Sequence, residues 1–273
     1  MQRTTVITGA SDGIGAAAAK MLAYPGHTLV VVGRSEEKTK AIAQELDADY
    51  FLADFADLAQ VRALAADLAH RYPRIDVLAN NAGGVMGQRE MTVDGHEKTF
   101  QVNHLAPFLL TTLLIDQLVK SRATIINTSS AANKIMAKFN IDDLDAQQHY
   151  TPNSAYGNAK LANILFTKEL NRRYGDHGVN AAAFHPGMVG TNFSSESAGS
   201  LRMIYSLFGR RFMLSPPQGA DTLVWLATTQ PGTDWEPGEY YVRRKPAKAN
   251  KLAEDPHLAQ QLWDTSAAMV RQG

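Results

Sequence analysis

The chain alternates short β-branched runs with longer amphipathic stretches, and this order limits the folds open to it more than any other feature. Apolar runs that predict strands lie at Arg3–Thr8, His27–Val32, Tyr50–Ala53, Ile75–Ala79, Ala123–Asn127 and Val179–Phe184. Stretches with the apolar spacing of amphipathic helices lie between them, at Ile14–Leu22, Ser35–Leu46, Leu58–Arg71, Gly95–Val119 and Ser154–Tyr174. Six β-α units in succession predict the α/β class. Its parallel sheet carries helices on both faces, because right-handed crossovers place them there.

The C-terminal third keeps this alternation less strictly. It predicts a helix near Gln218–Thr228, a strand at Glu239–Val242 and a last helix near Pro256–Val270. The added strand gives a doubly wound sheet of about seven strands. No linker rich in Pro, Gly or Ser divides the pattern, so we expect one domain over residues 1–273. The apolar segment at about 192–217 has no clean periodicity, which favours a substrate lid, although the same composition also fits a core segment.

Composition excludes several functional classes. Lys and Arg total 27 and Asp and Glu total 27, so the net charge is zero, which argues against nucleic acid as a partner. The absence of cysteine excludes disulfides, thiolate metal sites and a cysteine nucleophile. The histidines lack ligand spacing, so we expect no catalytic metal. No run approaches the ~18 consecutive apolar residues of a membrane span, and no leader pattern opens the chain, so we expect a cytoplasmic protein.

A glycine-rich loop follows the first predicted strand and precedes the first predicted helix. Its spacing is G-x-x-x-G-x-G, and such glycines let the backbone approach a ligand closely. The N–H groups at the start of the helix point at the same place, where a pyrophosphate fits. This arrangement predicts a Rossmann-type dinucleotide site, although a tight strand-to-helix turn also needs glycine. The residues that would contact the cofactor here are Gly9, Ser11, Asp12, Gly13, Ile14 and Gly15.

The second predicted strand ends in an arginine instead of an acid. In the usual dinucleotide site a carboxylate at this strand end binds the ribose 2′-hydroxyl. Here Arg34 follows Gly33, and a guanidinium can pair bidentately with a 2′-phosphate. The sequence therefore favours NADP(H) over NAD(H), with an ordinary solvated arginine before a helix as the alternative.

Tyr156 and Lys160 have the spacing of one helical turn. An i, i+4 pair lies on one helix face, and a nearby ammonium lowers the pKa of a phenol toward neutral pH. Such a pair can transfer a proton, yet alone it would more often be a surface pair. Hydroxyls at Thr128–Ser130 and the Asn80–Gly83 segment follow two predicted strands at the carboxyl edge, where ligands of such folds bind.

These motifs, taken in order and together with Pro186 and Gly187, resemble the short-chain dehydrogenase/reductase family over nearly the whole chain. The segments V-N-H-L-A-P-F-L-L-T and H-P-G-M-V-G-T are similar to the retinol dehydrogenase and protochlorophyllide reductase branch. The resemblance implies an NADP(H)-dependent oxidoreductase that moves a hydride between nicotinamide and a carbonyl or alcohol. Its substrate would be an apolar small molecule, such as a retinoid-like or steroid-like compound, and the enzyme could form a homo-oligomer.

The resemblance also assigns roles. Tyr156 would be the general acid/base, Lys160 would bind the nicotinamide ribose and lower the pKa of Tyr156, Ser130 would bind the substrate oxygen, and Asn103 would hold a water. Further cofactor contacts would come from Asp54, Asn80, Ala82 and Gly83 at the adenosine end and from Pro186, Gly187, Val189 and Thr191 at the nicotinamide end. Asp12 stands where the family more often has a basic residue, which weakens the preference for NADP(H). The alternative function is a catalytically weak NADP(H)-sensing regulator, against which the complete catalytic set argues.

Overall fold

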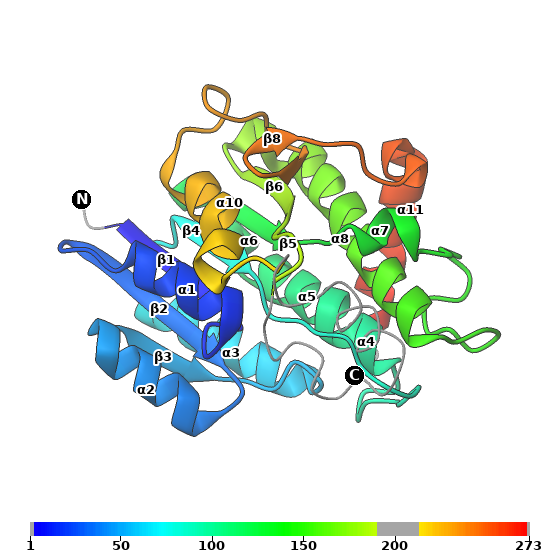
Figure 1. The fold of residues 1–273 in the computed structure, drawn as a ribbon, viewed down its shortest axis with the longest axis horizontal. Helices are drawn as coiled ribbons and strands as arrows, with labels where there is room; N and C mark the ends of the chain where they lie inside the picture. Colours follow the sequence, from blue (N-terminus) through cyan, green and yellow to red (C-terminus); the bar gives the residue numbers. More distant parts are fainter. Residues whose placement is uncertain (1–2, 190–212, 272–273) are drawn as a thin grey trace.

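A computed structural model describes residues 3–189 and 213–271. Within them eight strands form one sheet in the order β3-β2-β1-β4-β5-β6-β7-β8 (Figure 1). The first seven strands are parallel, and β8 pairs with β7 antiparallel. The strands are β1 (Arg3–Thr8), β2 (His27–Gly33), β3 (Asp49–Leu52), β4 (Val77–Asn80), β5 (Thr124–Thr128), β6 (Asn180–His185), β7 (Tyr240–Val242) and β8 (Lys245–Pro246).

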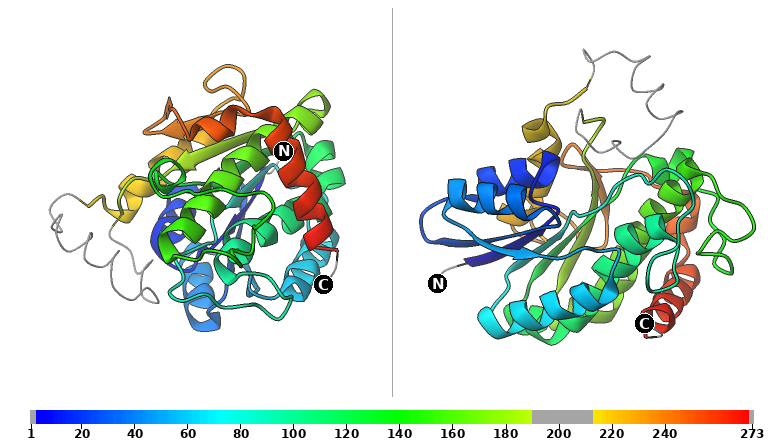
Figure 2. Two further views of the ribbon diagram at one scale, coloured as in Figure 1. Left: turned by 90° about the vertical axis from the view of Figure 1, so that its right-hand side faces the viewer. Right: turned by 90° about the horizontal axis from the view of Figure 1, so that it is seen from below.

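Helices cover both faces of the sheet, as two views at right angles show (Figure 2). One face packs against α1 (Gly13–Leu22), α2 (Glu36–Leu46) and α10 (Pro216–Thr228). The other packs against α3 (Leu58–Arg71), α5 (Ala106–Leu113), α8 (Pro152–Tyr174) and α11 (Pro256–Met269). Strand side chains alternate between the two cores: Val6 belongs to one and Ile7 to the other. The predicted doubly wound α/β fold is confirmed.

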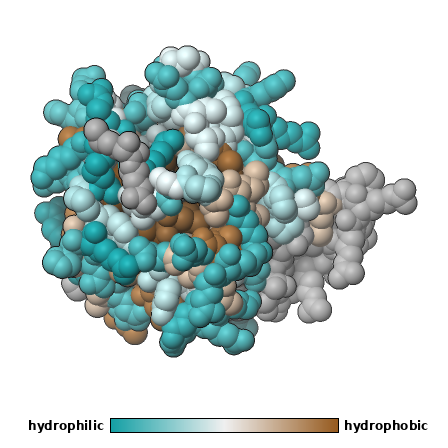
Figure 3. All heavy atoms as spheres, turned by 90° about the vertical axis from the view of Figure 1, so that its left-hand side faces the viewer, coloured by the Kyte–Doolittle hydropathy of each residue, from teal (hydrophilic) through white to brown (hydrophobic). Residues whose placement is uncertain are grey.

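The outer surface follows from this layering, because each helix turns one stripe toward the sheet and the rest toward water. Figure 3 shows one face of the molecule, on which hydrophilic side chains surround a smaller group of apolar ones. Within the described residues no single helix is long and apolar enough to cross a membrane. A bent pair, Lys98–Leu113 with Ile115–Ser121, meets that test only when its two parts are joined.

The prediction of one continuous helix over Gly95–Val119 is wrong. The chain instead forms α4 (Lys98–Phe100), a π-helical turn at Gln101–Leu105, α5 and α6 (Ile115–Ser121), with a bend of 65° at the break before α6. Pro107 has no N–H, so it cannot donate to the carbonyl of Asn103 four residues earlier, and the π-helical turn lies there. The 65° bend comes later, at Leu114, and the apolar pattern does not reveal it. The sheet also has one strand more than expected, because the two-residue β8 is too short to leave a pattern.

The expected lid falls mostly outside the described residues. Of the segment at about 192–217, the structure describes only residues 213–217. There, Leu214 donates its N–H to the carbonyl of Met188 at 2.8 Å, and Ser215 with Gln218 forms the capping box of α10. Leu214 therefore lies beside Gly187, where it touches the segment that follows β6.

Candidate active site

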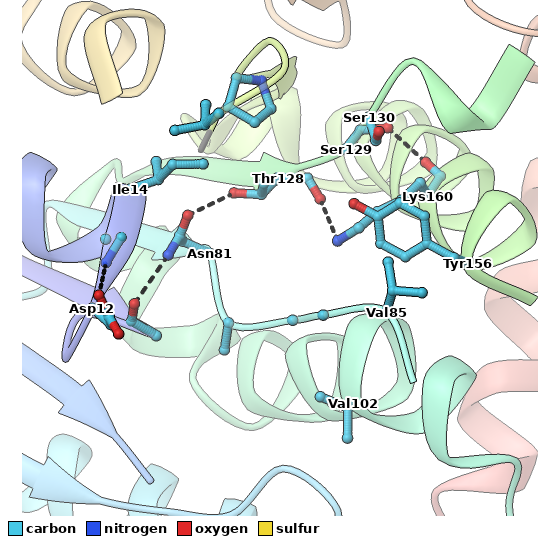
Figure 4. Close-up of a pocket in the computed structure, with 18 of the residues that line it drawn as sticks. Asp12, Ile14, Asn81, Val85, Val102, Thr128, Ser129, Ser130, Tyr156 and Lys160 are labelled. Atoms are coloured by element: carbon cyan, nitrogen blue, oxygen red, sulfur yellow. Dashed lines mark hydrogen bonds between the residues drawn. The ribbon is translucent and has the colours of Figure 1, made fainter. Parts of the chain in front are cut away.

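A cavity of about 460 Å³ opens at the carboxyl ends of the parallel strands. Between β1 and β4 the sheet order reverses, so the loops after these two strands diverge to opposite faces and leave a crevice. Residues from the glycine loop, from the ends of β2, β4, β5 and β6, and from α8 line this cavity (Figure 4). The sequence motifs thus meet in one place.

The glycine loop is packed tightly as well as open to the cavity. A Cβ on Gly9, which has φ +63°, would lie 2.7 Å from the Cα of Ala82, so the turn itself requires glycine. Asp12 is the N-cap of α1 and accepts the N–H of Gly13 at 2.7 Å. The N-terminus of α1 nevertheless points toward the cavity, since Ser11 and residues 12–15 line it. The loop is therefore both a tight strand-to-helix turn and part of the cavity lining.

The end of the cavity at which the sequence places an adenosine combines opposite charges. Arg34 and Asp54 line the cavity, and the carboxylate of Asp54 accepts the N–H of Ala56 at 3.0 Å. Lys38, on the first turn of α2, forms an ion pair of 3.0 Å with the carboxylate of Asp12. Lys38 was missed by sequence reasoning, and its position one turn after Arg34 was the available signal. Its charge offsets that of Asp12 beside the cavity.

The loop after β4 supplies Asn81 to the cavity, and Asn80 lies outside it. The amide of Asn80 is buried and donates to the hydroxyl of Thr111 at 3.0 Å and to the Oδ1 of Asn127 at 2.9 Å. Asn81 lines the cavity together with Ala82, Gly83 and Gly84. Successive side chains on a strand point to opposite faces of the sheet, so a prediction displaced by one residue names a side chain on the wrong face. The structure therefore does not bring Asn80 to the site.

Lys160 is the most buried charged group of the cavity. Its side chain is 1% exposed, and its Nζ donates to the carbonyl of Thr128 at 3.1 Å. The Nζ lies 5.4 Å from the centre of the Tyr156 ring, one turn earlier on α8. Burial away from water lowers the pKa of Lys160 to about 7. The proton of this ammonium is therefore held weakly near neutral pH.

The two serines after β5 differ in their surroundings. Ser129 is buried and donates its hydroxyl to the carbonyl of Lys160 at 2.7 Å, which ties the strand end to α8. The hydroxyl of Ser130 accepts the N–H of Ala132 at 3.2 Å and keeps its proton for another acceptor. Both line the cavity, but Ser130 is the one whose donor is uncommitted in these two contacts. The geometry thus favours Ser130 as the group for a substrate oxygen.

The side chain of Asn103 stabilises the loop that follows β4. It sits in the π-helical turn, fully buried, and its amide donates to the carbonyls of Gly84 at 2.9 Å and Thr99 at 2.8 Å. Its Oδ1 accepts the N–H of Gly84 at 3.1 Å. The side chain of Asn103 therefore fixes the backbone of the glycine pair that borders the cavity, and the water expected there stays a prediction.

The segment after β6 forms the end of the cavity at which the sequence places the nicotinamide. Pro186, Gly187, Met188 and Val189 line the cavity, whereas Thr191 lies outside the described residues. His185 also lines it, and burial lowers the pKa of its imidazole to about 4, so the ring is neutral. The Nδ1 of His185 is buried with no hydrogen-bond partner in the described part of the chain. A polar ligand group at this end would satisfy it.

Comparison with known proteins agrees with this geometry. A family model described as short chain dehydrogenase matches residues 3–200. The chain belongs to the short-chain dehydrogenase/reductase family. A Streptomyces sp. (strain C5) protein named "Putative daunorubicin C-13 ketoreductase DnrU" is 43% identical over 275 residues, which cover 98% of this chain and 92% of that protein. Retinol dehydrogenase 14 of Mus musculus is 36% identical over 288 residues, covering 98% and 86%. Similarity to the retinol dehydrogenase branch is thereby confirmed.

A solved structure shows that the similarity extends to the whole architecture of this short-chain dehydrogenase/reductase. A crystal structure of an uncharacterized protein from Mycobacterium Paratuberculosis superposes with a TM-score of 0.78 at 31% identity, covering 99% of this chain and 94% of the other. The family fold implies a nicotinamide cofactor. The residues present fit such a group: a helix N-terminus for the phosphates, glycines at the close approaches, and the buried Nδ1 of His185, which has no partner among the described residues.

Proposed function

We propose that the protein is an NADP(H)-dependent oxidoreductase that interconverts an apolar carbonyl compound and its alcohol. The observation that carries the proposal is a continuous cavity with two chemically distinct ends. One end has the N-terminus of α1 with Arg34, and the other has Tyr156, Lys160 and Ser130. A dinucleotide spans two such ends, with its reactive ring beside the acid/base group.

Tyr156, Ser130 and Lys160 each have a different role toward the substrate oxygen. The nicotinamide, when bound, supplies or accepts the hydride. During carbonyl reduction the hydroxyl of Tyr156 donates the proton that the oxygen needs. Ser130 donates a hydrogen bond to the same oxygen as negative charge builds on it. The ammonium of Lys160, one helical turn away, favours the phenolate of Tyr156 and so assists the proton transfer in both directions.

Two cations support the preference for NADP(H). Arg34 lines the cavity at the adenosine end, and Lys38 lies beside it in its ion pair with Asp12. Because Lys38 offsets the charge of Asp12, that carboxylate repels a 2′-phosphate less than an unpaired one would. A charge-assisted contact between Arg34 and a phosphate contributes ~1.5–3 kcal/mol, roughly a tenfold to more than a hundredfold gain in affinity.

The rim near Tyr156 supports an apolar substrate. Ile135 and Met188 line the cavity and are 72% and 41% exposed, although large apolar side chains are normally covered. Val85 and Met136 also line the cavity, and they belong to one apolar cluster with Tyr156. The relatives named above carry the names of a ketoreductase and a retinol dehydrogenase, which agrees with a ketone or an alcohol on an apolar skeleton.

The test compares cofactors and variants in one spectrophotometric assay with a panel of apolar aldehydes, ketones and alcohols. We expect a higher kcat/KM with NADPH than with NADH, and a reversed or abolished preference in Arg34→Asp. Tyr156→Phe should bind NADPH normally and lower kcat by ~10²–10⁴-fold, the usual contribution of acid–base catalysis. Equal kcat/KM with both cofactors would refute the cofactor preference. NADPH binding with no turnover above that of Tyr156→Phe would support the sensing alternative instead.

A further inference from the structure

A buried asparagine links the catalytic lysine to distant parts of the chain. Asn163 follows Lys160 on α8, and its Nδ2 donates to the carbonyl of Thr128 at 3.0 Å. The same carbonyl accepts the Nζ of Lys160 at 3.1 Å. The Nδ2 of Asn163 donates also to the carbonyl of Asn103 at 3.0 Å. One amide thus holds the end of β5 and the π-helical turn together beside the ammonium.

The sequence explains why the carbonyl of Asn103 can take this bond. In an α-helix it would accept the N–H four residues later, but that residue is Pro107, which has none. The helix forms a π-turn here, and Asn163 supplies a donor from α8. The proline that interrupts the helix therefore creates the acceptor that Asn163 uses.

The orientation of the Asn163 amide is determined by its partners. Both backbone carbonyls can only accept, so the nitrogen faces them and the Oδ1 faces away. That Oδ1 lies 3.3 Å from the Nδ1 of His104, and the Nε2 of His104 lies 2.9 Å from the hydroxyl of Ser266 on α11. Burial lowers the pKa of His104 to about 4, so the ring is neutral. His104 must then carry its proton on Nδ1 and accept from Ser266 on Nε2.

We infer that Asn163 is a positioning residue for Lys160, and that His104 and Ser266 hold it in the orientation that this task requires. The inference rests on the proposed function, in which the Lys160 ammonium acts on Tyr156. An ammonium that is 1% exposed depends on the few acceptors around it, and the carbonyl of Thr128 is one that Asn163 fixes in place. Displacement of a reacting group by about 1 Å can cost up to a hundredfold in rate. The C-terminal helix α11 is thereby coupled to the active site.

The competing explanation is that His104 only fills space. Its ring packs against Phe100, Phe108 and Phe166, with centroid distances of 5.0, 6.1 and 6.0 Å. Two variants separate the explanations. In His104→Asn the amide nitrogen takes the position of Nδ1 and still donates to the Oδ1 of Asn163. The shorter side chain leaves a larger cavity in the core than glutamine does. In His104→Gln the amide reaches the place of Nε2, keeps the contact with Ser266 and fills more volume, but loses Asn163.

If His104 only packs, both the melting temperature and kcat should be higher in His104→Gln than in His104→Asn. If it positions Asn163, the two readouts should have opposite orders. We then expect His104→Asn to be the less stable variant but to keep kcat within about threefold of the wild type. His104→Gln should lose about tenfold to a hundredfold in kcat, and its Kd for NADPH should rise, because the displaced Lys160 would also lose its expected contact with the nicotinamide ribose. The same order for stability and kcat would overturn the inference.

If the histidine variants fold poorly, a pair of serine variants with smaller changes tests the same inference. Ser266→Ala removes the hydroxyl that holds His104, and Ser121→Ala removes a hydroxyl of similar burial that bonds to Ile75 and Gln117, far from Lys160. Only Ser266→Ala should lower kcat, and equal kcat in both would overturn the inference. Crystal structures give a readout without turnover: the 3.1 Å contact from Lys160 to Thr128 should persist in His104→Asn and break in His104→Gln. A wild type that reduces no carbonyl would refute the proposed function alone.

Discussion

The buried ammonium of Lys160 makes the stability of the cofactor-free protein depend on pH in a defined window. Burial lowers its pKa from the ordinary 10.5 to about 7. In the unfolded chain the lysine regains its ordinary pKa, so between pH 7 and 10.5 the unfolded state binds more protons than the folded state. The free energy of unfolding therefore rises with pH across this window. Below about pH 7 both states are protonated, and the folded protein bears the full cost of the buried charge.

The size of the effect follows from the pKa difference. Each pH unit between the two pKa values adds about 1.4 kcal/mol to the free energy of unfolding, so Lys160 should contribute about 2–3 kcal/mol between pH 7 and pH 9. Lys160→Met keeps a side chain of similar length and removes the titration. At pH 6 the variant should be the more stable protein. Its advantage over the wild type should then shrink by about 2–3 kcal/mol at pH 9.

Urea denaturation of the cofactor-free wild type and Lys160→Met at pH 6 and pH 9 measures this difference, because all other titrating groups cancel. Lys168→Met is the matched control, since Lys168 lies on the same helix and pairs with Glu254 at the surface at 3.1 Å. A stability difference between wild type and Lys160→Met that is equal at both pH values would refute the reasoning. It would mean that the ammonium retains enough solvation or pairing to keep its ordinary pKa.

Two further pairs of variants, one of serines and one of glycines, test single hydrogen bonds and close packing in the structure. Ser130→Ala should lower kcat by ~10²-fold or more with little loss of stability, as for other donors to a developing oxyanion. Ser129→Ala should cost about 1 kcal/mol of stability, because it removes the hydrogen bond from the Ser129 hydroxyl to the carbonyl of Lys160. A loss of kcat in Ser129→Ala with a loss of stability in Ser130→Ala would exchange the two roles. Gly157→Ala should cost ~1–3 kcal/mol, because its Cβ would lie 2.6 Å from a backbone nitrogen at residue 137. Gly175→Ala, with its nearest contact at 3.4 Å, should cost far less, and equal melting temperatures would contradict this.

The fold was predictable because most residues of the central strands β1, β2, β4, β5 and β6 are buried on both faces of the sheet. Continuous apolar runs such as the one in β2, which spans His27–Gly33, separate cleanly from amphipathic helices. Local pattern could not show the break in Gly95–Val119, since the residues around Leu114, where the helix bends, are apolar enough for a helix. The two residues of β8 left no periodic signal at all.

The sequence placed Ser130, Tyr156 and Lys160 at the cavity, but it did not place every side chain of its motifs there. Motif order located the cavity, because parallel strands end at one edge. The choice between Asn80 and Asn81 depends on the pleat of β4 at its last residue, which a sequence specifies only to within one position. The ion pair of Lys38 with Asp12 and the contacts of Asn163 depend on how helices lie against loops. No spacing rule within a single segment contains that information.

Hydrogen-bonded polar side chains extend from the ends of β4 and β5 to the helix that carries Lys160. At the ends of β4 and β5, Asn80 and Asn127 bond to each other, and the amide of Asn127 donates to the hydroxyl of Thr167 at 2.9 Å. The hydroxyl of Thr167 in turn donates to the carbonyl of Asn163 at 2.7 Å. These polar groups bond to one another, and the amide of Asn163 shares the carbonyl of Thr128 with the ammonium of Lys160. The Nζ of Lys160 therefore has a fixed acceptor in the carbonyl of Thr128, and the residue lines the cavity, which is the position that the proposed action on Tyr156 and on a ribose requires.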